Sequence, residues 1–268
     1  ACNIVMQEID RMKRDSLLDN KFDFLNDDYQ STLSIIFHNC ASYRSHVRNI
    51  RSDFGFTKAD VIFLSECHTN PESDLKSTYL TEMPGYKLIH FTGSSQYKAS
   101  NGQICFVKDN KINNIEIVAD NSSNKMYKKT NILEISLFKY TQRQDMKEIY
   151  LCNVYNHPKN LLVDFYKEFK EFLRKHIKRN DFEEYELDHD VYVFGDFNIN
   201  FEESKTISEK LTKKLGLNIV NCIGKSTDYR TKIDWVITNS ANANLYNASF
   251  YESYFSDHKP ICLKLNLM

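Results

Sequence analysis

Short runs of hydrophobic residues alternate with polar segments along most of the chain. The runs are rich in Ile, Val, Phe and Tyr, a composition typical of β-strands. They lie at 33–38, 60–65, 86–91, 103–107, 131–138, 148–155, 190–194, 231–238 and 260–266, and a weaker one covers 113–118. The pattern therefore predicts nine or ten strands.

Other segments repeat their hydrophobic residues with the period of an α-helix. The clearest covers 161–179, and weaker ones cover 41–54 and 203–217, where Gly216 is a predicted C-terminal cap. Residues 1–30 are charged and contain neither glycine nor proline, so we predict a helical extension or linker there. In 161–179 the predicted buried face consists of Leu162, Phe165, Phe169, Phe172, Leu173 and Ile177.

This order of elements limits the fold class. So many strands with few helices between them suit neither an alternating βαβ chain nor a pure barrel. We predict an α/β (α+β) fold in which two packed, mostly antiparallel β-sheets are flanked by helices. Because the sequence has no internal repeat and no proline-rich linker, we expect a single folded domain over 31–268 after the extension at 1–30.

Composition and charge exclude some classes of protein. The net charge of −1 and the isoelectric point of about 6.8 rule out a global basic field, although a local patch suffices to bind nucleic acid. None of the seven cysteines forms a CxxC pair, which favours reduced thiols in a nuclear or cytoplasmic protein and disfavours a zinc site. No hydrophobic run approaches the ~18 residues of a membrane span.

Candidate chemistry lies where hydrophobic strands end. An acid alone at such a position is usually a solvated turn or a helix cap, but here four strand ends carry polar groups, and strand ends present side chains to a shared cleft. The residues are Asn39, Glu66, Asp196 with Asn198, and Asp257 with His258. Carboxylates with amide and imidazole partners suit magnesium or manganese and a phosphodiester substrate.

The segment "VYVFGDFNIN" (191–200) shows how such a strand end could work. If the strand continues, Asp196 and Asn198 point to the same side, while Phe197 points into the core. Gly195 allows a close approach of another backbone or a bulge. We therefore expect Asp196 and Asn198 to enter one cleft together, with Phe197 as their anchor.

The ordered set of motifs resembles the endonuclease/exonuclease/phosphatase superfamily, which has the deoxyribonuclease-I-like fold. The resemblance rests on "GDFN", on "SDH" before the last strand, and on the Asn and Glu that end the first two strands, and it covers 33–268. It implies a four-layered α/β sandwich and magnesium-dependent hydrolysis of a phosphoester, with manganese as the other suitable ion. By position, Glu66 is similar to the principal metal ligand, assisted by Asn39 and Asp257.

The same resemblance implies catalytic roles. Asp196 is similar to the residue that orients or deprotonates the attacking water, and Asn198 to the amide that contacts the phosphate. His258 is similar to the imidazole on the scissile phosphate, and Asp234 in "KIDWVIT" to the acid that holds it. Tyr155 lies where the family places a Tyr or His near the phosphate and the leaving oxygen.

Substrate contacts beyond these are expected from several positions. His157 follows Tyr155 by two residues and shares its face if the strand continues, so either could assist the leaving group. Thr227 is a candidate phosphate contact. Lys125, Lys128 and Lys129 concentrate positive charge around a tyrosine, which suits a nucleic-acid backbone. The chain departs from the family at Ala41 and Ser65, where relatives have an Asp or Asn and a Gln.

Narrower resemblances concern the substrate. The tyrosine-containing version is similar to retrotransposon-type and abasic-site endonucleases, and the leader with the segment 33–69 is similar to the endonuclease domain of Helitron-like transposon proteins, which follows a helicase. We therefore expect a monomeric DNA endonuclease, or nickase, of a mobile element, downstream of a helicase. The alternatives are a phosphatase, sphingomyelinase or deadenylase with the same site, or an inactive binding domain.

Overall fold

A computed structural model describes residues 32–94, 101–121, 133–142, 147–177, 187, 189–229, 231–241, 247–250 and 255–267. Two mixed β-sheets form its centre. The seven-stranded sheet has the order β10 (Asn221–Ile223), β12 (Asn247–Phe250), β13 (Ile261–Asn266), β1 (Thr32–Asn39), β2 (Val61–Ser65), β4 (Ile104–Lys108), β3 (Tyr86–Phe91). The six-stranded sheet has the order β5 (Ile115–Asp120), β6 (Leu133–Thr141), β7 (Glu148–Asn156), β8 (Asp190–Asp196), β11 (Asp234–Thr238), β9 (Asn218–Ile219).

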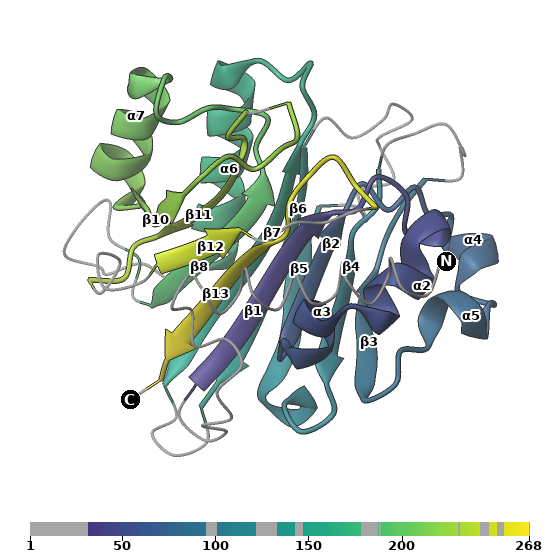
Figure 1. Ribbon diagram of the computed structural model, residues 1–268. Coiled ribbons are helices and arrows are strands. Elements are labelled where there is room, and N and C mark those ends of the chain that lie inside the picture. Colours follow the sequence, from purple (N-terminus) through teal and green to yellow (C-terminus); the bar gives the residue numbers. More distant parts are fainter. Residues whose placement is uncertain are drawn as a thin grey trace.

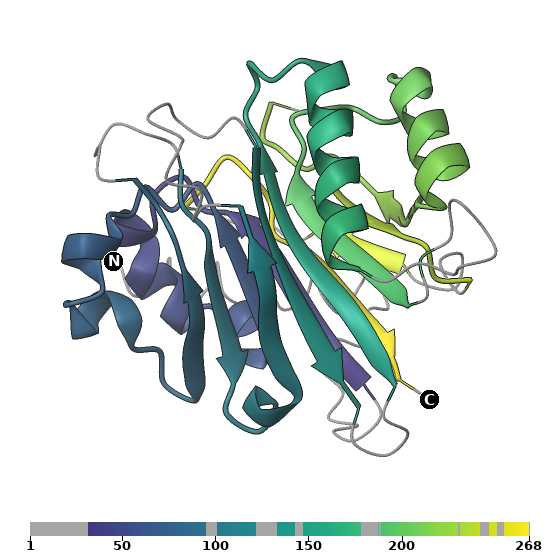
Figure 2. The ribbon, with the colours of Figure 1, turned by 180° about the vertical axis from the view of Figure 1, so that it is seen from behind.

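Helices cover the outer face of each sheet, which gives four layers (Figure 1, Figure 2). On the seven-stranded sheet lie α2 (Tyr43–Ser52) and α3 (Phe54–Lys58), with the single turns α4 (Pro71–Asp74) and α5 (Thr78–Thr81) beside them. On the six-stranded sheet lie α6 (Leu162–His176) and α7 (Lys205–Leu215). The predicted fold class is thereby confirmed.

Alternation along the central strands explains the three hydrophobic layers. In β8, Tyr192 and Phe194 face the other sheet, while Val191 and Val193 face α6 and α7. Both faces are therefore buried, which is why the central strands read as continuous hydrophobic runs instead of alternating ones. The ring of Phe165 in α6 packs at 5.9 Å from that of Phe197, as the amphipathic pattern of 161–179 predicts. Leu162, predicted on the same buried face, is instead 43% exposed at the start of the helix.

The short elements escaped prediction. β9, β10, β12, α4 and α5 each contain two to four residues, too few to carry a hydrophobic period. The predicted helix at 203–217 is present as α7, and Gly216 caps it in the left-handed conformation with φ 66°. The predicted helical extension at 1–30 lies outside the described residues.

Buried polar side chains join the two sheets. Asn153 in β7 donates from Nδ2 to the carbonyl of Leu64 in β2 at 3.2 Å. Gln103, directly before β4, donates from Nε2 to the carbonyl of Asn153 at 3.1 Å and accepts from the hydroxyl of Ser136 at 2.8 Å. These bonds fix the relative position of the sheets just below the strand ends that carry the candidate site.

Gly195 is required by the close approach of β8 to β7. A Cβ added there would lie 2.5 Å from the carbonyl oxygen of Val154. We expect Gly195→Ala to lower the free energy of unfolding by about 2–3 kcal/mol, because the strands would have to separate. Gly216→Ala serves as the control: its Cβ meets nothing within 4 Å, so only the positive φ costs energy, about 1 kcal/mol. Urea denaturation measures both, and equal losses would contradict the steric explanation.

Candidate active site

The polar strand ends converge at one end of the sandwich (Figure 1). β1 and β2 run parallel and bring Asn39 opposite Ser65, the residue before Glu66. In the other sheet, β8 and β11 are antiparallel and pair Asp196 with Asp234. A hydrogen bond from Asn39 Nδ2 to Asp196 Oδ2, at 2.9 Å, connects the two sheets at this point.

Asn39 holds two carboxylates together. Its Nδ2 donates to Glu66 Oε2 at 3.0 Å and to Asp196, while its Oδ1 accepts the N–H of Ala41 at 3.1 Å. The acceptor role of Oδ1 sets the orientation of the amide. Asn39 therefore donates to both carboxylates and holds the negative charges of Glu66 and Asp196 close together.

Glu66 is fixed by an unusual backbone conformation. Its φ is 47°, which costs about 1 kcal/mol for a residue with a side chain. Tyr155 Oη donates a short hydrogen bond to Glu66 Oε1. Ala41, Ser42, His68 and Asn198 also have positive φ. Such conformations gather at sites whose surroundings hold them in place.

Asn198 reaches the site by a turn, which corrects the expected strand alternation. β8 ends at Asp196, and Asn198 has φ 49°. Its N–H donates to Asp196 Oδ1 at 2.9 Å, and its Nδ2 donates to the carbonyl of Asn156 at 2.8 Å. Phe197 is buried, as predicted. The short polar side chain of Asn tolerates the left-handed conformation, so the chain can turn at Asn198 and β8 does not continue past Asp196.

His258 and Asp234 form a buried pair. Nδ1 of His258 lies 2.9 Å and 3.1 Å from the two carboxylate oxygens of Asp234, and Nε2 lies 3.9 Å from Asp196 Oδ2. Burial alone would lower the pKa of His258, but Asp234, then Asp196 and Asp257, outweigh it and raise the pKa to about 10. Burial and the charge of Asp234 raise the pKa of Asp196 to about 8.

The donor set fits a hard divalent cation. Carboxylate oxygens of Asp196 and Asp234 lie within 4.8 Å of each other, and Asn39 links Asp196 to Glu66. His258 lies in the same cluster, but as an imidazolium it has no lone pair to offer a cation. Burial first, and then the charge of Asp234, raise the pKa of Asp196, so a cation bound here would offset the cost of ionising it. Carboxylate oxygens crowded in this way match the preference of magnesium or manganese.

The remaining predicted site residues are Asp257, Thr227 and three lysines. Asp257 is partly exposed, and its main-chain carbonyl accepts the N–H of Asp228 at 2.8 Å. Thr227 forms a β-bridge with His258, and its hydroxyl lies 2.6 Å from that of Thr231. Their assigned roles stay predictions. The predicted substrate contacts Lys125, Lys128 and Lys129 lie outside the described residues.

His157 does not continue the strand of Tyr155. β7 ends at Asn156, and Nδ1 of His157 accepts the N–H of Lys159 at 3.1 Å in the following turn. Strand alternation therefore does not place His157, but its ring still lies 6.5 Å from that of Tyr155, edge-on to it, while Tyr155 contacts Glu66 directly. The proline at 158, which disfavours a continuing helix or strand, was the available signal. Which of the two assists the leaving group stays a prediction.

Ser256 is a site residue that sequence reasoning missed. Its hydroxyl donates to the carbonyl of Asn39 at 2.7 Å and accepts the N–H of His258 at 3.1 Å. It thereby ties the loop before β13 to the end of β1. Its place in "FSDH" was visible, but its partner lies 217 residues away in the sequence.

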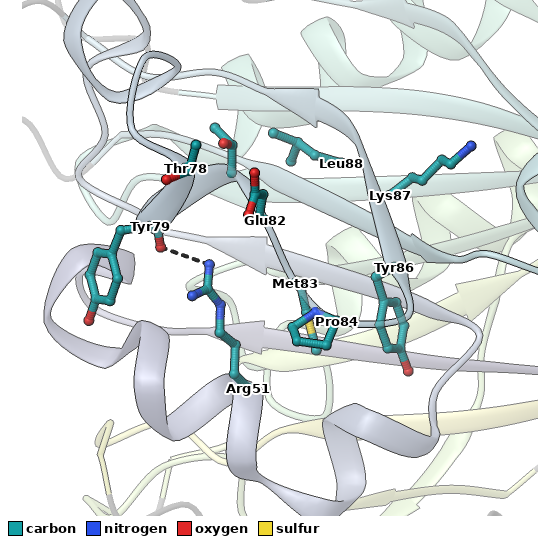
Figure 3. A pocket seen from close by; sticks show the side chains of 10 residues that line it. Arg51, Thr78, Tyr79, Glu82, Met83, Pro84, Tyr86, Lys87 and Leu88 are labelled. Carbon is teal, nitrogen blue, oxygen red and sulfur yellow. Dashed lines mark hydrogen bonds between the residues drawn. The ribbon is translucent and has the colours of Figure 1, made fainter.

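A separate groove lies toward the opposite end of the seven-stranded sheet (Figure 3). It is lined by the end of α2, by α5 and by the beginning of β3. Arg51 donates there to the carbonyl of Tyr79 at 2.7 Å and lies over the Tyr79 ring. None of the predicted site residues lines it.

Comparison with solved structures shows the fold. The chain is similar to an AP endonuclease from Leishmania major, with a TM-score of 0.69 and 13% identity over 92% of this chain and 90% of that one. It is also similar to the endonuclease domain of TRAS1, a telomere-specific non-LTR retrotransposon, with a TM-score of 0.61 and 15% identity over 88% and 99% of the two chains.

A third similar structure is the human Nocturnin catalytic domain, with a TM-score of 0.55 and 13% identity over 89% of this chain and 94% of that one. No protein-family model and no curated protein sequence matches the chain. The likenesses show that the chain has the fold of the endonuclease/exonuclease/phosphatase structures. Among the described helices, none is both long and apolar enough to cross a membrane.

Proposed function

We propose that the chain is a metal-dependent phosphodiester hydrolase of the endonuclease/exonuclease/phosphatase superfamily. The observation that carries this proposal is the buried series Asp234, His258 and Asp196, connected through Asn39 to Glu66 across two sheets. Such a series supplies both a group that accepts a proton and a cationic group that binds an oxyanion, as phosphoester hydrolysis requires.

Each residue has a distinct part in this chemistry. Asp196 orients the attacking water and accepts its proton as the oxygen attacks phosphorus. His258, kept as an imidazolium by Asp234, donates to a non-bridging phosphate oxygen, where negative charge develops. Asn198 contacts the phosphate, and the hydroxyl of Tyr155 lies beside Glu66 for the leaving oxygen.

Glu66 would be the principal ligand of a magnesium ion, with manganese as a substitute. Asn39 and Asp257 would assist, and Asn39 also links Glu66 to Asp196 through the hydrogen bonds of its Nδ2. When bound, the cation would neutralise charge on the phosphate and lower the pKa of a bound water. The hydrogen bonds from one amide to the carboxylates of Glu66 and Asp196, which hold the two acids at one point, support the assignment.

We further propose DNA as the substrate, cut as an endonuclease or nickase of a mobile genetic element. The similarity to an AP endonuclease and to a retrotransposon endonuclease domain supports this choice. The catalytic domain would span 31–268, act as a monomer, and follow a helicase in the longer protein. The similarity to a mannosyl-6-phosphatase from Bacteroides thetaiotaomicron, with a TM-score of 0.55, keeps a phosphatase as the second candidate.

A substrate panel with and without chelator tests the proposal. We expect the purified chain with magnesium to nick supercoiled plasmid, and EDTA to abolish nicking while the far-UV circular dichroism spectrum is retained, because the cation would lie in a cleft and not in the core. Oligonucleotides, phosphoinositides, sphingomyelin and a sugar phosphate complete the panel.

Three results would count against the proposal. If no nucleic acid in the panel were cleaved, nuclease activity would be excluded. Undiminished hydrolysis in EDTA would exclude metal dependence. Unfolding of the domain by the chelator would indicate a structural metal instead of a catalytic one.

A further inference from the structure

Glu134 is a buried acid that lies beneath the candidate site and outside the predicted set of site residues. It belongs to β6, is 3% exposed, and both carboxylate oxygens accept the N–H of Gly102, at 3.1 Å and 3.2 Å. Its direct neighbour on β7 is Tyr155, whose hydroxyl donates to Glu66. Inside the protein such a bond holds its segment firmly, because leaving either the carboxyl oxygen or the main-chain N–H without a partner is costly.

Gly102 transmits this contact to the segment that carries Glu66. The carbonyl of Gly102 accepts the N–H of Cys67 at 3.0 Å, and the carbonyl of Asn101 accepts the N–H of His68 at 3.0 Å. Gly102 has φ 123°, and a Cβ there would lie 2.5 Å from the hydroxyl of Thr69. The contact between the two segments is therefore close, and a displacement of Gly102 would displace Cys67.

The same segment is held from its other side by the chain before α2. The N–H of Cys40 donates to the carbonyl of Ser65 at 3.1 Å, and the N–H of Ser42 donates to that of Glu66 at 2.9 Å. Glu66 and His68 both have positive φ, which persists only where the surroundings determine it. Two flanking segments determine it here, and Glu134 anchors one of them.

We propose that Glu134 is a positioning residue for Glu66. Through Gly102 and Cys67 it keeps the backbone of Glu66 in the left-handed conformation that directs the Glu66 carboxylate toward Asn39 and Asp196. The inference rests on the proposed function, because positioning matters if Glu66 binds a divalent cation. Partners that orient a metal ligand typically contribute tenfold to a hundredfold in metal affinity.

Asp60 provides a matched control at the opposite end of β2, the strand that Glu66 follows. It directly precedes β2, is 7% exposed, and its Oδ2 accepts the N–H and the hydroxyl of Ser34 at 2.9 Å and 3.0 Å. Asp60 is thus also a buried acid that fastens one end of β2 to a neighbouring segment. Removing it removes a similar contact without touching the candidate site.

The experiment measures Mn²⁺ affinity by electron paramagnetic resonance, below the unfolding temperature of every variant. We expect Glu134→Ala to weaken affinity about tenfold to a hundredfold. Glu134→Gln, which keeps an oxygen for Gly102, should stay within about threefold of the wild type, and Asp60→Ala likewise. If Glu134→Ala does not fold, Glu134→Asp tests the same point, since it keeps the charge and shortens the reach.

A second readout needs no metal. Amide hydrogen exchange at Cys67 and His68 should accelerate about tenfold in Glu134→Ala and stay unchanged in Asp60→Ala. Unaltered exchange and Mn²⁺ affinity in Glu134→Ala would overturn the inference, as would equal losses in Asp60→Ala or in Glu134→Gln. Absence of Mn²⁺ binding and of hydrolysis in the wild type would instead overturn the proposed function, and the exchange data would still decide whether Glu134 positions the segment.

Discussion

Replacement of Asp196 by asparagine is expected to lower kcat for phosphodiester hydrolysis by about 10³-fold. Asparagine has the same shape and can keep one hydrogen bond, to Asn198 or to Asn39, but it cannot accept a proton from water. The loss should appear in kcat and not in substrate binding, because the proton moves only in the transition state. Steady-state kinetics on a single-site oligonucleotide measures it.

The same variant should be more stable than the metal-free wild type at neutral pH. Burial and Asp234 hold the pKa of Asp196 at about 8, above its ordinary value, so ionised Asp196 destabilises the folded chain. The wild type without metal should therefore lose stability as pH rises through about pH 4 to about pH 8, whereas Asp196→Asn lacks this loss. A variant with low kcat and a urea midpoint at neutral pH above that of the metal-free wild type would meet both expectations.

Asp53→Asn is the control for Asp196→Asn. Asp53 is also buried, but it caps α3 by accepting the N–H groups of Gly55 and Phe56, and asparagine caps helices equally well. Wild-type kcat is expected for this variant. If Asp196→Asn retained wild-type kcat with magnesium, Asp196 would not be the base.

The sandwich was predictable from the sequence because its central strands are buried on both faces. Runs such as 33–38 and 190–194 read as strands without any knowledge of their partners. The same feature placed the candidate chemistry, since Asn39, Glu66 and Asp196 each follow one of these runs. Their convergence then depends only on parallel pairing within each sheet and on the packing of the two sheets.

What was not predictable depends on contacts made after folding. The turn at Asn198 forms because its amide finds the carbonyl of Asn156, and the positive φ of Glu66 is held by segments before α2 and before β4. Glu134 and Ser256 act through residues 32 and 217 positions away. The periodicity of hydrophobic residues reports local secondary structure and carries no information about such long-range contacts. The sequence therefore identified the residues at the strand ends but not the residues that hold them in position.

Replacement of Asp234 by asparagine is expected to lower kcat at neutral pH by about 10³-fold, because Asp234 determines both the charge and the orientation of His258. Asp234 is the strongest of the acidic neighbours that raise the pKa of His258 to about 10 against the effect of burial. Without it the pKa falls, since only Asp196 and Asp257 then oppose burial. The imidazole becomes neutral and can no longer donate from both nitrogens.

The effect of Asp234→Asn on kcat should depend on pH, because it acts through the protonation of His258. In the wild type the folded pKa of His258 lies above its ordinary value, so its stabilising contribution is complete below about pH 6.5 and is lost as pH rises toward about pH 10. In Asp234→Asn that contribution shrinks, and protonation of His258 requires lower pH. The ratio of kcat of the variant to that of the wild type should therefore rise as pH falls from about pH 9 to about pH 6.

A double-mutant cycle separates the action of Asp234 through His258 from any independent action. If Asp234 acts by holding and charging the imidazole, Asp234→Asn combined with His258→Ala should be little slower than His258→Ala alone. Multiplicative losses would show that Asp234 acts by another route, such as direct binding of the cation, for which its carboxylate lies in the same cluster as that of Asp196. Nitrogen-15 NMR of the His258 ring, titrated in the wild type and in Asp234→Asn, reports the change in pKa directly and decides between the two routes even where residual activity is too low to measure.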